Sequence, residues 1–148
     1  YIKASALAKN ISLPVIADDS GLEVFSINNL PGVFSARYAY IGATDEENIT
    51  KLLGALKDKP TSERKAKFIC SLVLIEDYDK QKISYFNGEW KGEIANKKTG
   101  NHGFGYDPIF YLPSLKKTAA ELATEIKNKV SHRAIAINKL KNFLESQQ

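Results

Sequence analysis

The chain has 148 residues, of which 43% are hydrophobic and 26% are charged, and its formal net charge is +4. This length and composition fit one folded domain with a real core and exclude a disordered chain. The sequence contains no apolar run of membrane-spanning length, no signal-peptide pattern and no arginine-rich block with interleaved aromatics, and its single Cys70 lies within an apolar run. We therefore expect a cytoplasmic protein that binds neither membranes nor nucleic acid, and whose modest positive charge suits an anionic ligand.

The first residues have the spacing of an amphipathic helix. Ala4, Leu7, Ala8 and Ile11 follow the i, i+3, i+4, i+7 pattern, which predicts a helix that buries this stripe and ends near residue 10. Lys3 lies at the margin of the stripe. Its side chain can reach into a pocket that the helix borders or extend to solvent, and the spacing is compatible with both.

The next stretch, Val15-Ile-Ala-Asp-Asp-Ser-Gly21, combines a buried strand with two carboxylates. The apolar run predicts the strand, and Ser20-Gly21 predicts the turn that ends it. Because side chains alternate along a strand, Asp18 and Asp19 are expected to point to opposite sides. One interpretation is an Asx-type turn that caps the strand; the other, which we favour, is a pocket that one acid faces.

The middle of the chain alternates strands, turns and a helix. Residues 22–27 predict a second strand, 28–32 a turn, 65–75 a strand that becomes apolar on both faces, and 83–90 its return strand after a polar connection at 76–80. Thr44 with Glu47 forms a capping box for a helix that Pro60 is expected to stop. Trp90 is expected in the core, and the pattern does not assign Ser35 or Arg37.

A second unusual stretch is Gly100-Asn-His-Gly-Phe-Gly-Tyr-Asp-Pro108. Its glycines allow the backbone to approach a ligand closely, and an aromatic ring between two glycines has an unobstructed face that suits a planar ligand. The glycine order matches neither the phosphate-loop nor the dinucleotide pattern. The alternative is a tight turn before a strand at 109–111.

Two helix starts follow. Thr118 with Glu121 predicts a capping box for a helix through Val130, and Ser131 predicts the N-cap of a final helix. The first turn of that final helix carries His132 and Arg133, and cations there face the positive end of the helix dipole. A helix start with extra donors suits an acceptor, either a phosphate or a carbonyl oxygen, and Lys127 could add another donor.

With these stretches in view, the chain resembles the inosine triphosphate pyrophosphatase family, which hydrolyses inosine, deoxyinosine and xanthosine triphosphates. The matching runs follow the family's order and spacing along the whole chain. They are 13–22 (LPVIADDSGL), 31–39 (PGVFSARYA), 103–110 (GFGYDPIF), 117–122 (KTAAEL) and 131–133 (SHR).

The resemblance implies an α/β fold, with a mixed twisted sheet, flanking helices and two lobes around a nucleotide cleft. It implies a magnesium-dependent nucleoside triphosphate pyrophosphatase that acts as a homodimer and releases pyrophosphate and a nucleoside monophosphate. Asp19 matches the metal ligand and general base, and Lys3 the lysine that contacts the phosphates. The positions that match substrate-binding residues are Ser20, Phe104, Gly105, Tyr106, Asp107, Lys127, His132 and Arg133.

The chain departs from the family pattern at two points. The family's Thr/Ser-x-Asn-x-x-Lys phosphate loop and the acidic residue after it are not in the sequence, and Ala134 replaces a glycine. We therefore expect residues 1–148 to form a single domain, the C-terminal three-quarters of the complete family domain. Two alternatives follow: a truncated, catalytically impaired nucleotide-binding relative, or a pyrophosphatase of similar fold directed at modified pyrimidine nucleotides.

Overall fold

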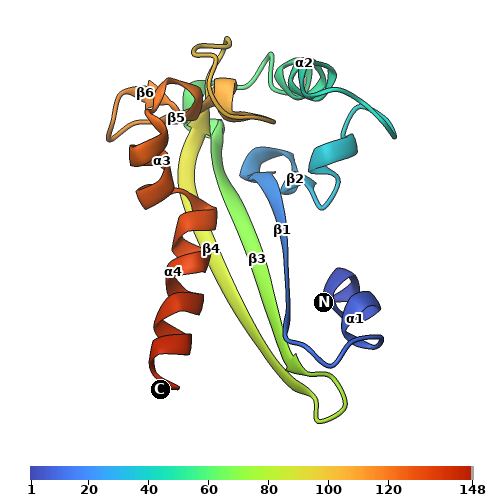
Figure 1. The fold of residues 1–148 in the computed structure, drawn as a ribbon. Coiled ribbons are helices and arrows are strands. Elements are labelled where there is room, and N and C mark those ends of the chain that lie inside the picture. The colour runs from blue at the N-terminus through green and yellow to red at the C-terminus, as the bar shows by residue number, and fades with distance from the viewer. Residues whose placement is uncertain (148) are drawn as a thin grey trace.

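The computed structural model describes residues 1–147, which form one long sheet with helices packed against it (Figure 1). The strands lie in the order β2-β1-β3-β4-β5-β6. They are β1 (Val15–Val24), β2 (Leu30–Gly32), β3 (Lys65–Asp77), β4 (Lys82–Ile94), β5 (Phe110–Leu112) and β6 (Lys117–Thr118). The helices are α1 (Ile2–Ala8), α2 (Asp45–Ala55), α3 (Thr124–Val130) and α4 (His132–Glu145).

The predicted α/β class is confirmed, but the sheet differs from the mixed sheet that was expected. Every strand pair among residues 1–147 is antiparallel. Short connections account for the pairs β1–β2, β3–β4 and β5–β6, because they force neighbouring strands to run in opposite directions. The pairs β1–β3 and β4–β5 are joined by longer segments.

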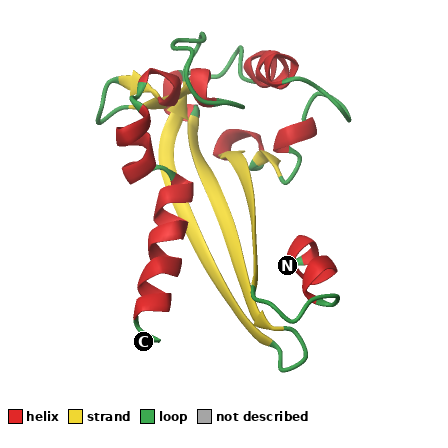
Figure 2. Ribbon diagram, viewed as in Figure 1, coloured by secondary structure: helices red, strands yellow, loops and turns green. Residues whose placement is uncertain are grey.

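The long strands β1, β3 and β4 carry a helix on each face at one end of the molecule (Figure 2). Cys70, Leu72 and Leu74 pack in one cluster with residues of α4, whereas Val73 and Ile75 pack in another with residues of α1. Alternate side chains of β3 therefore enter opposite cores. This confirms the prediction of a strand covered on both faces and the prediction that Cys70 is a core residue.

A larger core fills the other end of the sheet, where α2, β5 and the ends of β3 and β4 meet. Trp90 belongs to it, as predicted. The capping box of α2 is also confirmed, because the Glu47 amide donates to Thr44 Oγ1 and the Thr44 amide donates to Glu47 Oε2 (3.3 and 2.8 Å). The prediction that Pro60 stops this helix is wrong, since α2 already ends at Ala55.

Strand β1 does not end at Ser20-Gly21, and residues 22–27 are not a separate strand. The ladder with β3 continues through Ser20 and Gly21 to Val24, and a short 3₁₀ turn follows at Phe25–Ile27. A side chain at Gly21 would place its Cβ 2.6 Å from the carbonyl oxygen of Gly32 in β2. The glycine therefore allows β2 to approach closely and does not form the predicted turn.

Two helix predictions also need correction. Ala4 and Ala8 of α1 are buried, but Leu7 is 52% exposed, and Ile11, which lies beyond the end of the helix, is 38% exposed, so only half of the predicted stripe is covered. The Thr118 capping box exists, but it opens a short 3₁₀ turn at Ala119–Glu121 and not α3. The chain leaves the helical backbone at Leu122, which is buried in the larger core.

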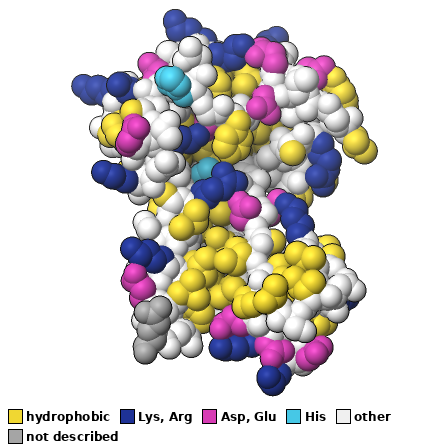
Figure 3. All heavy atoms as spheres, in the orientation of Figure 1, with side chains coloured by type: hydrophobic (Ala, Val, Ile, Leu, Met, Phe, Trp, Pro, Cys, Tyr) yellow, Lys and Arg dark blue, Asp and Glu magenta, His cyan; other side chains and the backbone are white. Residues whose placement is uncertain are grey.

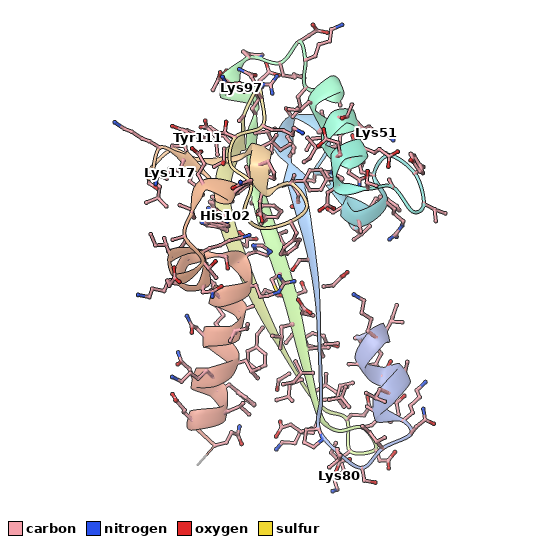
Figure 4. All side chains as sticks on the ribbon, turned by 45° about the horizontal axis from the view of Figure 1, so that its top comes forward. Lys51, Lys80, Lys97, His102, Tyr111 and Lys117 are labelled. Atoms are coloured by element: carbon pink, nitrogen blue, oxygen red, sulfur yellow. The ribbon has the colours of Figure 1, made fainter. Side chains whose placement is uncertain are left out.

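The two ends of the sheet carry different features. Lys51 on α2 and His102 on the loop before β5 lie at the end with the larger core, whereas Lys80 lies in the β3–β4 hairpin at the opposite end (Figure 4). Within residues 1–147, no helix combines the length and apolar character needed to span a membrane.

Candidate functional site

The two adjacent acids of β1 point to opposite faces of the sheet, as predicted, and each meets a cation from a different helix. Lys3 Nζ of α1 lies 2.9 Å from Asp19 Oδ1, and both side chains are largely exposed. On the other face, Arg133 of α4 donates from Nε and from one Nη to Asp18 Oδ2, at 3.0 and 2.8 Å. Strand β1 is thus held between the two helices at this point. Lys/Arg and Asp/Glu side chains lie next to one another near the middle of the visible face (Figure 3).

The loop between β4 and β5 presents Phe104 from a tightly held backbone. The flanking glycines Gly103 and Gly105 have φ angles of +82° and +58°, the left-handed region that glycine adopts without strain. The Phe104 amide donates to Asp107 Oδ2 (2.9 Å), and the Gly105 amide donates to Asp45 Oδ2 (2.6 Å). These contacts hold the Phe104 ring, which is 60% exposed, in a defined place.

Two cations lie over the Phe104 ring. Lys127 Nζ is 5.2 Å and Arg133 Cζ is 5.7 Å from the ring centroid. Lys127 also forms an ion pair with Asp107, which is almost fully buried. An aromatic face and two multi-donor cations therefore converge on one point.

These groups border a cavity of about 520 Å³ between the Phe104 loop, α3 and α4. Ser131 also lines this cavity. Its hydroxyl accepts a hydrogen bond from the Ala134 amide (3.2 Å) and so fixes the start of α4, as predicted. The predicted site residues along this cavity are Phe104, Lys127, His132 and Arg133. Its volume fits a purine nucleoside.

Two smaller cavities lie between the first one and Asp19 of β1, and each shares lining residues with the one before it. A cavity of about 140 Å³ shares Phe104 and His132 with the large one and adds Gly105, Tyr106, Asp107 and Ser20. A third cavity, of about 230 Å³, shares Ser20 with the second one and includes Asp19. All predicted site residues except Lys3 line this series, and Lys3 reaches it through its ion pair with Asp19.

His132 does not act as the cation that the sequence suggested. Its ring is buried and stacks on Phe68, with ring centroids 4.8 Å apart, and lies near Trp90. Burial, followed by the charges of Arg133 and Lys127, lowers the pKa of His132 to about 4. The imidazole is therefore neutral at physiological pH, and the unfavourable interaction with the helix dipole concerns Arg133 alone.

This depressed pKa predicts a pH-dependent stability. Between about pH 4 and the ordinary value of 6.5, the unfolded chain binds the His132 proton more strongly than the folded chain does. Stability is therefore expected to be full above pH 6.5 and to fall by about 3 kcal/mol as the pH drops toward 4. Urea unfolding between pH 7.5 and 4.5 measures this loss. His132→Gln should flatten the dependence, whereas the same change at the exposed His102 should leave it intact; equal slopes in both variants would contradict the assignment.

Asp45 is a site residue that the sequence analysis missed. It is the first residue of α2, where an acid is ordinarily explained by helix stability, yet its carboxylate crosses to the Phe104 loop and lines the second cavity. The unassigned Ser35 lies in the same place, because its carbonyl accepts a hydrogen bond from the Tyr106 hydroxyl (2.9 Å). No local pattern identifies either contact, since each joins segments that are distant in the sequence.

Comparison with known proteins places the chain in a family. The Ham1 family model matches residues 1–143. A dITP/XTP pyrophosphatase from Photorhabdus laumondii is 49% identical over 145 residues, which cover 98% of this chain and 74% of the relative. A dITP/XTP pyrophosphatase from Staphylococcus epidermidis is 48% identical over 147 residues, which cover 99% of this chain and 73% of the relative.

Solved structures agree with this assignment. The Ham1 protein of Staphylococcus aureus superposes with a TM-score of 0.92 at 48% identity, covering 99% of this chain and 74% of that one. A Ham1 protein from Coxiella burnetii superposes with a TM-score of 0.93 at 48% identity, covering 98% of this chain and 74% of that one. The chain belongs to the Ham1 family.

Proposed function

We propose that this protein hydrolyses inosine, deoxyinosine and xanthosine triphosphates to the monophosphate and pyrophosphate, and so clears aberrant purines from the nucleotide pool. The observation that carries the proposal is the aromatic face of Phe104 with Lys127 and Arg133 over it, in a cavity that shares lining residues with a small one, which in turn shares Ser20 with the cavity of Asp19. The names of the relatives support the same chemistry.

The base side of the site favours a purine that carries a keto group. The ring of Phe104 offers a stacking surface, and the two cations can only donate hydrogen bonds. A 6-keto oxygen accepts from such donors, whereas the amino group of adenine leaves them unpaired, at a cost of about 1–3 kcal/mol for each buried donor. Lys127 and Arg133 are thus proposed to read the base, with Ser20, Gly105, Tyr106, Asp107 and His132 shaping the pocket around the nucleotide.

The phosphate side depends on Asp19. Its exposed carboxylate fits magnesium, which binds proteins through one or two carboxylates together with substrate phosphates, and residues 1–147 contain no ready-made cluster of three metal-ligating side chains. When bound, Mg²⁺ would polarise the phosphate oxygens. Asp19 would orient or deprotonate the water that attacks the α-phosphorus, and Lys3 would neutralise charge that develops on the phosphates.

We further propose that the protein works in the cytoplasm as a homodimer. Several large apolar side chains are exposed within residues 25–41, including Val33 at 77% and Ile41 at 89%. Exposed apolar groups concentrated in one segment are typical of an association surface and support a self-association.

Product analysis tests the proposed function. With Mg²⁺, dITP, ITP and XTP should each yield a monophosphate and pyrophosphate in equal amounts, at least about 100-fold faster than dATP. Release of inorganic phosphate and a diphosphate would contradict the proposal. Faster hydrolysis of methylated pyrimidine triphosphates would favour the pyrimidine-directed alternative, and binding of ITP without turnover would favour the impaired relative.

A further inference from the structure

We propose that Asp18 is the positioning residue that fixes the Arg133 guanidinium at the wall of the base cavity and thereby sets the preference for keto purines. This inference rests on the proposed function. It assigns a role to the acid that precedes Asp19, whose side chain points to the other face of the sheet.

The geometry of the pair supports positioning. Asp18 Oδ2 accepts from both Nε and one Nη of Arg133, at 3.0 and 2.8 Å, and the same Nη lies 3.4 Å from Ser20 Oγ. Two of the five N–H groups of the guanidinium are thus held by one carboxylate oxygen and a third by Ser20, and the two on the other Nη remain available. A charged contact of this kind fixes the plane and direction of the fork, which a single hydrogen bond does not.

The charges over Phe104 give an independent reason for a second carboxylate. Lys127 and Arg133 both approach the same ring and repel one another. Asp107 compensates Lys127 by an ion pair, and Asp18 compensates Arg133 in the same way. Among residues 1–147, Asp18 is the one carboxylate within ion-pair distance of Arg133.

The side chain of Arg133 depends on this contact for its place. It is 38% exposed, so a long flexible side chain without its partner would sample many rotamers in solvent. Removal of Asp18 should therefore disperse the guanidinium donors that face the base, while Asp19 and Lys3 on the opposite face keep their arrangement. Removal of Asp18 should therefore reduce base discrimination and the affinity for ITP, but it should not slow the chemical step.

Steady-state kinetics with ITP and ATP in the presence of Mg²⁺ separate these effects. Asp18→Ala should lower the ITP/ATP ratio of kcat/KM about tenfold, mainly by raising KM for ITP, with kcat within about threefold of the wild type. Asp18→Glu should recover a large part of the preference, because it restores the carboxylate. Asp18→Asn serves as a second variant that keeps the shape of the side chain. Asp77→Ala, which removes an acid paired with Lys80 in the distant hairpin, is the matched control and should change nothing.

A double-mutant cycle tests whether Asp18 acts through Arg133. Asp18→Ala combined with Arg133→Ala should be no less selective than Arg133→Ala alone. The proposal would be overturned if the losses of selectivity in the two single variants multiplied in the double variant. An unchanged ITP/ATP ratio of kcat/KM in both Asp18→Ala and Asp18→Asn would also overturn it.

An NMR measurement tests the contact between Asp18 and Arg133 independently of the proposed function. The ¹⁵N NMR signal of Arg133 Nε–H should be sharp and protected from exchange in the wild type, and should broaden in Asp18→Ala but not in Asp77→Ala. An Nε–H signal that is the same in wild type and Asp18→Ala would overturn the inference, whatever the substrate. If the wild-type protein showed no preference for ITP over ATP, the proposed function would fail, and an Arg133 signal that depends on Asp18 would still support the positioning contact.

Discussion

Replacement of Asp19 by asparagine is expected to slow dITP hydrolysis by a factor of about 10³ or more while the melting temperature changes by less than about 2 °C. The amide keeps the shape of the side chain, but it is neither a base nor a charged magnesium ligand. The effect on stability should be small, because the Lys3 and Asp19 side chains are 66% and 72% exposed and an exposed ion pair contributes little.

A matched substitution on α4 controls for the loss of a surface charge. Glu145 pairs with Lys141 at 3.6 Å, and these side chains are 59% and 67% exposed, so the pair is also largely exposed. Glu145→Gln should leave turnover and melting temperature unchanged. Retention of more than about a tenth of wild-type turnover in Asp19→Asn would remove Asp19 from the mechanism.

The largest effect on stability is expected at Gly88 in β4. A Cβ there would collide with the carbonyl oxygen of His132 and lie 2.8 Å from the backbone nitrogen of Ala136. Both are backbone atoms of α4, so no side chain can rotate away. Gly88→Ala should lower the free energy of unfolding by about 3 kcal/mol or more, measured by urea denaturation.

The same substitution should also weaken nucleotide binding, because the first turn of α4 must move away from β4 and take Arg133 with it. Gly54→Ala in α2 is the control. Apart from the neighbouring backbone of the helix itself, no atom lies within 4 Å of the added Cβ, so this variant should be as stable as the wild type or up to about 1 kcal/mol more stable. If Gly88→Ala and Gly54→Ala unfolded at the same urea concentration, the close packing of α4 on β4 would be contradicted.

Local signals in the sequence predicted much of the fold. The capping box at Thr44 and the N-cap at Ser131 depend on residues three positions apart, and both are present as predicted. The continuous apolar run of β3 likewise indicated, from local sequence alone, that both faces of the strand are buried. The opposite directions of Asp18 and Asp19 followed from the alternation of a strand.

The incorrect predictions share a physical cause, which is that a neighbour distant in the sequence decided the outcome. Gly21 looked like a turn residue, but the Gly32 carbonyl requires a glycine there. The periodicity of α1 identified an apolar face without showing that Leu7 would remain uncovered. The neutral state of His132 depends on Phe68 and on burial, which no local pattern contains.

The sequence pointed to most of the residues that line the candidate site, but it missed Asp45 and it did not predict the contacts. Resemblance to a family brought Phe104, Lys127 and Arg133 together, and the structure places the two cations over the ring. The pairing of Asp18 with Arg133 joins residues 115 positions apart. The hydrogen bond that the Gly105 amide donates to Asp45 joins residues 60 positions apart. Only the folded sheet and its packed helices bring such partners within hydrogen-bond distance.

The central claim is that the cavity beside Phe104 holds a keto purine, and an NMR titration with inosine monophosphate tests it most directly. The largest amide shifts should occur at residues 103–105 and 131–133, and adenosine monophosphate should cause smaller shifts at the same positions. Shifts that are largest at residues 76–79, which line a separate cavity of about 410 Å³ near the β3–β4 hairpin, or equal responses to both nucleotides, would contradict the account.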